Sequence, residues 1–160
     1  MADEDQRRTF LRHTLATLSY RGGKAVRGVP AGFALFAPGG GGRSAVAILA
    51  HVGDLLDWAL SIAKGERVWK ESPPLGWDAE VARFHAACRA LDDVLASDAP
   101  LAAPSEKLFQ GPIADALTHV GQIAILRRLF GEPVKGENYY VADIATGRVG
   151  EDQAPPRREF

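Results

Sequence analysis

The sequence predicts an all-α fold, and a four-helix bundle in particular, from three observations. The prolines leave four long proline-free windows, at 1–29, 39–72, 75–99 and 113–132, and helix interiors exclude proline because it lacks an N–H and clashes with the preceding turn. Apolar residues recur in these windows at the three- and four-residue steps of a buried helix face. No segment shows the sustained alternation of a strand. Four helices of about 20 residues, each about 30 Å long, make a bundle the economical architecture.

The first helix is expected over residues 5–26 and the second over residues 44–64. Gly22 and Gly23 weaken the end of the first, because glycine is a poor helix former. Ser44 follows four glycines and suits the N-cap of the second. The apolar residues that predict these helices are Phe10, Leu11, Leu15 and Leu18 in the first, and Ile48, Leu49, Val52, Leu55, Leu56, Trp58, Leu60, Ile62 and Ala63 in the second. The second helix carries so many that we expect it to be broadly buried.

The third helix is expected over residues 78–96 and the fourth over residues 112–130. Pro112 suits the first position of a helix, where no N–H is needed. Gly131 suits the C-terminal end, and Arg127 and Arg128 complement the helix dipole in the last turn. The apolar face of the third helix is formed by Val81, Phe84, Cys88, Leu91 and Leu95.

The remaining segments connect these helices or follow them. The connections at 27–43, 65–77 and 97–111 are each long enough to run the length of a bundle, so loop length leaves the topology open. After Gly131, the glycines and prolines indicate an irregular C-terminal arm. We therefore expect one domain over residues 1–150 and a loose tail at 151–160.

Composition excludes several classes of function. The chain has 160 residues with 19 Lys+Arg against 20 Asp+Glu, a net charge of −1, which supplies no basic field for nucleic acid. A single cysteine, Cys88, excludes an internal disulfide framework and a multi-cysteine zinc site, and its place on an apolar stripe predicts a core residue. No apolar run approaches a membrane span, and the polar N-terminus is unlike a signal peptide. We expect a cytoplasmic protein with neither nucleic-acid nor membrane partners.

Two histidines and an aspartate form the candidate site. His51 and His119 lie on apolar stripes of the second and fourth helices, and Asp115 lies one turn before His119. Helix axes in a bundle are 8–10 Å apart, a gap that two imidazoles and a carboxylate can close around one divalent ion with positions left for water or substrate. In the alternative reading, His119 is a hydrogen-bonded core residue that Asp115 only orients.

Four other features of the sequence have a structural or a functional interpretation. Gln122, three residues after His119, is a candidate to orient that histidine or contact a substrate, and otherwise belongs to a solvated helix face. His85 is expected to pair locally, with Asp92 among its neighbours, and His13 belongs to no motif. The glycine-rich segment 38–44 lacks the lysine and glycine spacing of a phosphate-binding loop, and we assigned it to a flexible linker.

Two helix motifs give a resemblance to a known family. Residues 114–123 read ADALTHVGQI and are followed by two arginines and Gly131, and residues 49–54 read LAHVGD with Trp58 downstream. These segments resemble the fourth and second helices of the DinB/YfiT-like superfamily of metal-binding four-helix bundles, whose fourth helix typically reads H-x-x-x-H-x-G-Q-I. The similarity covers residues 9–130. It implies that His51 and His119 are the first and last metal ligands, with Asp115 in place of the usual middle histidine, which lowers the charge of the site by one.

The resemblance also implies a topology and a function. The order would be up-down-down-up, with the 65–77 connection as the long crossover. The protein would be a metalloenzyme in which one divalent ion (Zn, Ni, Fe or Mn) activates water or a low-molecular-weight thiol, as a hydrolase-like enzyme or a thiol-S-transferase acting on a small-molecule substrate. A homodimer is expected because such bundles commonly pair. The alternative is a non-enzymatic helical dimer module that binds a metal or a small molecule.

Overall fold

The computed structural model describes residues 2–160, and this part of the chain is helical, as predicted. It contains no strand, only an isolated antiparallel bridge between Glu137 and Glu159. The long helices lie within a few residues of their expected bounds, apart from the start of the fourth. The helical segments are α1 (Ala2–Val26), η1 (Phe33–Leu35), α2 (Ala45–Ala63), α3 (Trp77–Ala96), α4 (Ser105–Leu108), η2 (Phe109–Ile113), α5 (Ala114–Phe130) and η3 (Tyr139–Val141).

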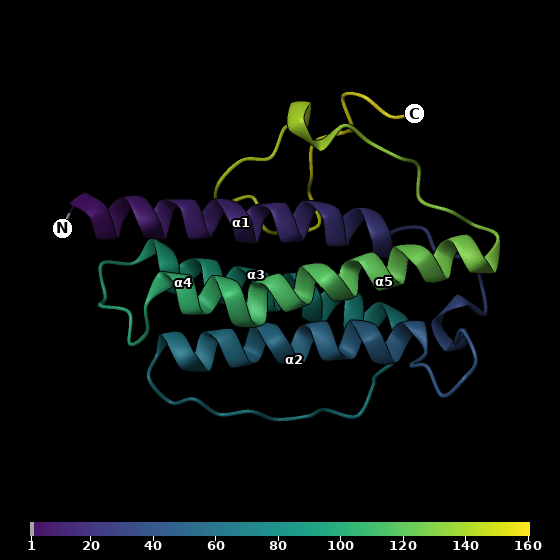
Figure 1. Cartoon of the computed structure of the whole chain (residues 1–160), viewed down its shortest axis with the longest axis horizontal. Helices are drawn as coiled ribbons and strands as arrows, with labels where there is room; N and C mark the ends of the chain where they lie inside the picture. Colours follow the sequence, from purple (N-terminus) through teal and green to yellow (C-terminus); the bar gives the residue numbers. More distant parts are fainter. Residues whose placement is uncertain (1) are drawn as a thin grey trace.

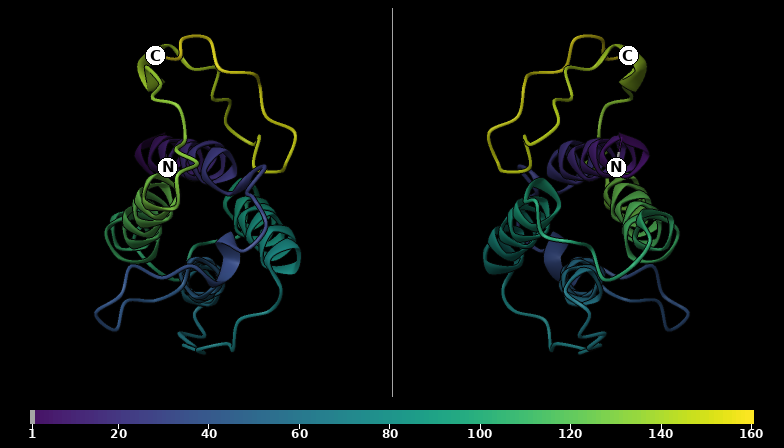
Figure 2. Two further views of the ribbon diagram at one scale, coloured as in Figure 1. Left: turned by 90° about the vertical axis from the view of Figure 1, so that its right-hand side faces the viewer. Right: turned by 90° about the vertical axis from the view of Figure 1, so that its left-hand side faces the viewer.

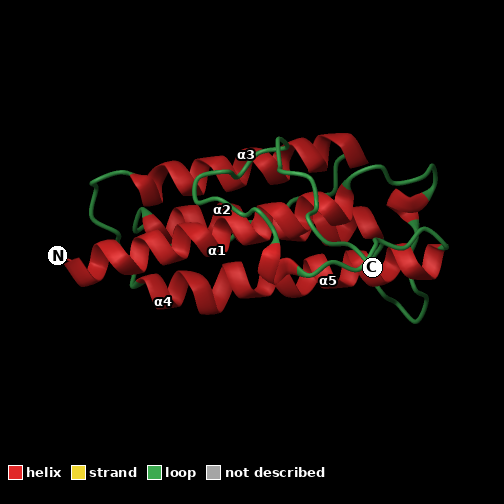
Figure 3. Ribbon diagram, turned by 90° about the horizontal axis from the view of Figure 1, so that it is seen from above, coloured by secondary structure: helices red, strands yellow, loops and turns green. Residues whose placement is uncertain are grey.

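The four long helices lie side by side around one hydrophobic core (Figures 1 and 3). Helix α2 packs on α3 and α5, and α1 packs on the same two helices from the other side. In Figure 1, α1 and α5 run from left to right, whereas α2 and α3 run from right to left. The segment 64–76 therefore travels back along the length of α2 before α3 begins.

Helix α2 is the most apolar helix and is largely buried. Its N-cap is Ser44, whose Oγ accepts a hydrogen bond from the N–H of Ala47 at 3.4 Å. By length and composition alone α2 could cross a membrane, but 61% of its most apolar window is buried inside the protein. This burial is what the core helix of a folded domain requires.

A glycine in α1 allows the helix to approach α3 closely. A Cβ atom built on Gly22 would lie 2.5 Å from Cζ of Phe84, so any other residue would displace the buried Phe84 ring. The helix continues to Val26, as expected, because this contact offsets the low helix propensity of glycine. Cys88 is fully buried on the same face of α3, and its burial raises the pKa of the thiol.

The helical region that corresponds to the fourth expected helix begins at Ser105, earlier than the expected residue 112. Segments α4 and η2 lead directly into α5, so Pro112 lies within a helical segment. The N–H of Ala114 donates to the carbonyl of Phe109, five residues back, as in a π-helix. This wider turn accommodates the ring and the missing N–H of Pro112, which is why the proline does not mark the start of the helix.

Polar contacts anchor the 64–76 segment to α2 and α3. Arg83 of α3 donates to Asp54 Oδ1 at 2.6 Å and to Asp57 Oδ2 at 2.7 Å. The other oxygen of Asp54 accepts the backbone N–H of Ser72 at 3.1 Å. We call Arg83, Asp54 and Asp57 the arginine cluster. Gly53 makes room for it, since a Cβ atom there would lie 2.9 Å from Cζ of Arg83.

The C-terminal arm, residues 131–160, lies on the side of α1 that faces away from α2 (Figure 2). Buried Glu137 accepts hydrogen bonds from the Tyr20 hydroxyl and from Lys24 Nζ, both at 2.6 Å. The N–H of Phe160 donates to the carbonyl of Gly136 at 3.0 Å. The last residue of the tail is thus hydrogen-bonded to the start of the arm.

Candidate metal centre

The structure brings together the three residues of the candidate site. His51 extends from α2, and Asp115 and His119 extend from α5, so that one potential ligand atom of each lies within 4.8 Å of the others. The two imidazole rings meet edge to face with centroids 4.7 Å apart. Nε2 of His119 lies 3.5 Å from Oδ1 of Asp115. We call these three residues the histidine cluster.

The packing of α2 against α5 sets this arrangement. Ile48 of α2 and Ala116 and Ile123 of α5 are buried in the core on either side of the cluster. Because the two helices run in opposite directions (Figure 1), His51 can meet His119 only where the helices are correctly offset along their axes. Their 4.7 Å ring separation means that this offset is present.

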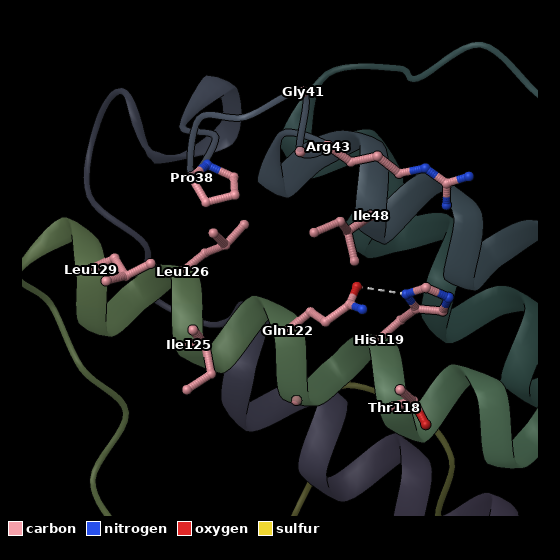
Figure 4. Close-up of a pocket in the computed structure, with 12 residues that line it drawn as sticks. Pro38, Gly41, Arg43, Ile48, Thr118, His119, Gln122, Ile125, Leu126 and Leu129 are labelled. Atoms are coloured by element: carbon pink, nitrogen blue, oxygen red, sulfur yellow. Dashed lines mark hydrogen bonds between the residues drawn. The ribbon is translucent and has the colours of Figure 1, made fainter.

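Gln122 orients His119. Its Oε1 atom lies 2.7 Å from Nδ1 of His119 (Figure 4). A carbonyl oxygen only accepts hydrogen bonds, so Nδ1 is the donor in this pair, and Nε2 is the ring nitrogen that faces Asp115. An imidazole held in this way by a neighbour at its other nitrogen is a typical arrangement for a metal ligand. The sequence had suggested this role for Gln122.

His51 is held in a less polar environment. Its Nδ1 atom is buried and has no hydrogen-bond partner. Burial, together with the nearby His119 and Arg43, lowers the pKa of His51 below its ordinary value. Trp69, from the 64–76 segment, packs edge to face on the ring with centroids 5.8 Å apart. His51 is therefore a neutral imidazole near pH 7, the form that binds metals.

One side of the histidine cluster opens to solvent and to a cavity. The side chain of Asp115 is 49% exposed. A cavity of about 850 Å³ begins at His119 and Gln122 and extends along α5. Its apolar lining is Pro38, Ile48, Ile125, Leu126 and Leu129 (Figure 4). The three candidate donors thus leave room for a further ligand beside them.

The sequence did not predict the role of the glycine-rich segment. Pro38, Gly41 and Gly42 form one wall of this cavity, and Arg43 lies at its edge. Gly39, Gly40 and Gly41 all have positive φ angles, which non-glycine residues rarely adopt. The segment that we assigned to a flexible linker is therefore a shaped turn. The only signal in the sequence was the glycine run itself.

The other two histidines do not join the cluster. His85 is buried in α3 and packs on Phe84, with ring centroids 5.0 Å apart. Its Nδ1 atom has no hydrogen-bond partner, and its neighbour Asp92 instead accepts hydrogen bonds from Arg12 on both oxygens at 2.9 Å. His13 is exposed on α1, with Nδ1 3.4 Å from the hydroxyl of Thr146.

Neither a protein-family model nor a curated protein nor a solved structure matches this chain. The resemblance to the DinB/YfiT-like superfamily is therefore based on the helix motifs alone.

Proposed function

We propose that this protein binds one divalent metal ion through His51, Asp115 and His119, and that it is an up-down-down-up four-helix bundle of the DinB/YfiT-like type. The observation that carries the proposal is the convergence of three potential ligand atoms, from helices far apart in sequence, within 4.8 Å of one another. The opposite directions of α1 and α5 on the one hand and α2 and α3 on the other (Figure 1) support the bundle order.

The chemistry of the donors fits a metal ion. His51 has a buried nitrogen without a partner, and a buried polar atom without a partner costs free energy. Gln122 engages Nδ1 of His119, which leaves Nε2 as the nitrogen that would bind the ion. Asp115 adds the negative charge that offsets a cation. Two imidazoles and one carboxylate suit zinc, nickel, iron or manganese.

The surroundings of the histidine cluster favour an enzyme that acts on a small-molecule substrate. A bound divalent ion would lower the pKa of a coordinated water or thiol and so supply a nucleophile near neutral pH. Gln122 holds the imidazole of His119 in place, and the adjoining cavity has room for a substrate. Trp69, which itself packs on Trp58, covers one side of His51. We propose thiol-S-transfer, with a low-molecular-weight thiol as co-substrate, or hydrolysis. The cytoplasm and a homodimer are part of this proposal.

One observation favours the non-enzymatic alternative. Leu35, Ile125 and Leu129 are exposed, and the last two line the cavity beside His119. Such an apolar surface can bind a second copy of the chain or another partner, so the protein could be a helical dimer module. Turnover of electrophilic substrates with thiols by the metal-loaded protein distinguishes an enzyme from this module.

The first test is metal content. We expect one divalent ion per chain in the parent protein after zinc loading and desalting, measured by elemental analysis. His119→Ala should lose the ion, and Asp115→His should keep or tighten it. His13→Ala is the matched control, because His13 is exposed on another helix. Equal zinc content in the His119→Ala and parent proteins would refute the metal site.

A further inference from the structure

We infer that the cavity beside the histidine cluster binds an amphipathic organic anion: a carboxylate or phosphate ester on an aliphatic chain, with its charged end near His119. This inference rests on the proposed function, since it places the charged end of the substrate next to the proposed metal ion. It also names a substrate class that the metal site alone does not define.

The charge within the cavity has one sign. Among the described residues that line it there is one charged side chain, Arg43, and no carboxylate. Some arginines in residues 2–160 are tied to carboxylates, for example Arg12 to Asp92 and Arg83 to Asp54, whereas Arg43, like Arg128, takes part in no ion pair of this kind. Its guanidinium is therefore available for an anion, and guanidinium groups bind carboxylates and phosphates well.

The two ends of the cavity differ in polarity. In Figure 4, Arg43 extends toward His119 at one end, while Pro38, Leu126 and Leu129 gather at the other. From His119 to Leu129, helix α5 advances about 15 Å at 1.5 Å per residue, which is enough for an aliphatic chain of medium length. An anion bound by Arg43 would extend its apolar chain over Leu126 and Leu129.

The shape of the wall supports a small occupant. The turn at 39–41 uses three glycines with positive φ, and a Cβ atom on Gly42 would lie 2.6 Å from Cγ of Pro38. The wall is thus made of backbone and a proline ring, with no side chain projecting from the turn into the cavity. This leaves about 850 Å³, within the size range of pockets for small organic ligands.

The test uses octanoate and its uncharged analogue octanol, titrated calorimetrically into chelator-treated and zinc-loaded protein. We expect octanoate to bind more tightly than octanol in both forms. Arg43→Gln should weaken the binding of octanoate about tenfold or more, as expected for the loss of a charged hydrogen bond. It should leave the affinity for octanol unchanged. Arg128→Gln is the matched control, because Arg128 is exposed on α5 and does not line the cavity.

Several results would overturn the inference. Octanol binding as tightly as octanoate, or equal losses in Arg43→Gln and Arg128→Gln, would exclude recognition of the anion by Arg43. If Ile125→Asp dissociates a dimer and octanoate binds only to the dissociated protein, the cavity is an interface between copies. Failure of octanoate to bind leaves zinc content unaffected, whereas failure of the metal site leaves octanoate binding to the chelator-treated protein intact, so the two proposals fail separately.

Discussion

Helix α2 contributes to two polar clusters whose chemistry differs sharply. Asp54 and Asp57 belong to the arginine cluster, where Arg83 donates hydrogen bonds to both carboxylates. The backbone N–H of Ser72 donates to the remaining oxygen of Asp54. One turn earlier, His51 belongs to the histidine cluster, where its Nδ1 has no partner and its ring meets that of His119 edge to face. The first cluster is complete within the chain. The second contains a buried nitrogen, Nδ1 of His51, that has no hydrogen-bond partner among the described residues.

The two clusters differ in how the surroundings treat a buried charge. Burial of charge is compensated in the arginine cluster: burial alone would lower the pKa of Arg83, but the hydrogen bonds that Arg83 donates to Asp54 and Asp57 outweigh it and raise the pKa. In the histidine cluster burial lowers the pKa of His51, and the neighbouring His119 and Arg43 lower it further. Surroundings that stabilise the neutral form leave an imidazole free to bind a cation.

The largest expected effect is in the arginine cluster. Arg83→Met should lower the free energy of unfolding by about 3–5 kcal/mol, because it leaves the carboxylate of Asp54 buried and unpaired. Asp54 is only 2% exposed. Urea unfolding measures the loss, and Arg128→Met should change stability by less than about 0.5 kcal/mol. Adding Asp54→Leu to Arg83→Met should recover most of the loss, and a single-variant loss as small as that of Arg128→Met would contradict this account.

The next effect should appear in the histidine cluster, and only with metal present. Zinc at about 100 times its dissociation constant should stabilise the parent protein by about 2.7 kcal/mol. His119→Ala should lose most of this gain, while His13→Ala should retain it. Urea unfolding with zinc and with a chelator provides the measurement. If zinc stabilises His119→Ala as much as the parent, the cluster does not bind the ion.

Glycine-to-alanine substitutions in α2 and α5 should change stability by a smaller amount and in opposite directions. Gly53→Ala should cost about 1–2 kcal/mol, because the new methyl group must displace the bonded guanidinium of Arg83. Gly121→Ala on α5 has open space around it and should gain up to about 1 kcal/mol from helix propensity. Thermal unfolding compares the two variants. Stabilisation by both would mean that Arg83 can move without loss.

The smallest effect concerns pH. The folded pKa of His51 is lowered from the ordinary value of 6.5, so the unfolded chain binds a proton before the folded protein does. The contribution of His51 to the free energy of unfolding is therefore complete above pH 6.5. It is lost as the pH falls below 6.5 toward the folded pKa. In chelator-treated protein His51→Gln should flatten this loss, measured by urea unfolding at several pH values. His13→Gln should follow the parent, and an unchanged slope in His51→Gln would assign the loss to other groups.

Much of the fold could be predicted because helix periodicity and proline position are local signals. They located Val26, Ala63 and Ala96 as helix ends to within one residue. The start at Ser105 was missed because a π-helical turn accommodates Pro112, and no local pattern distinguishes this from a proline at a helix start.

The candidate site was predictable in part for the same reason. Asp115, His119 and Gln122 lie on one helix at fixed spacing, so their proximity follows from the sequence. The meeting of His51 with them was a hypothesis from the apolar stripes and the spacing of helices in a bundle, and the family resemblance supported it. Arg43 and Trp69 were missed because each approaches His51 from a loop, and the path of a loop is set by tertiary contacts such as the one between Asp54 and Ser72.

The attachment of the C-terminal arm also orders events during biosynthesis. A ribosome releases α1 first, and protein chains fold from the N-terminus as they emerge. Tyr20 and Lys24 must nevertheless stay hydrated until Glu137 has been translated, since that carboxylate is their partner. The helical core can therefore assemble while this face of α1 is still bare, and the arm covers it as a late step.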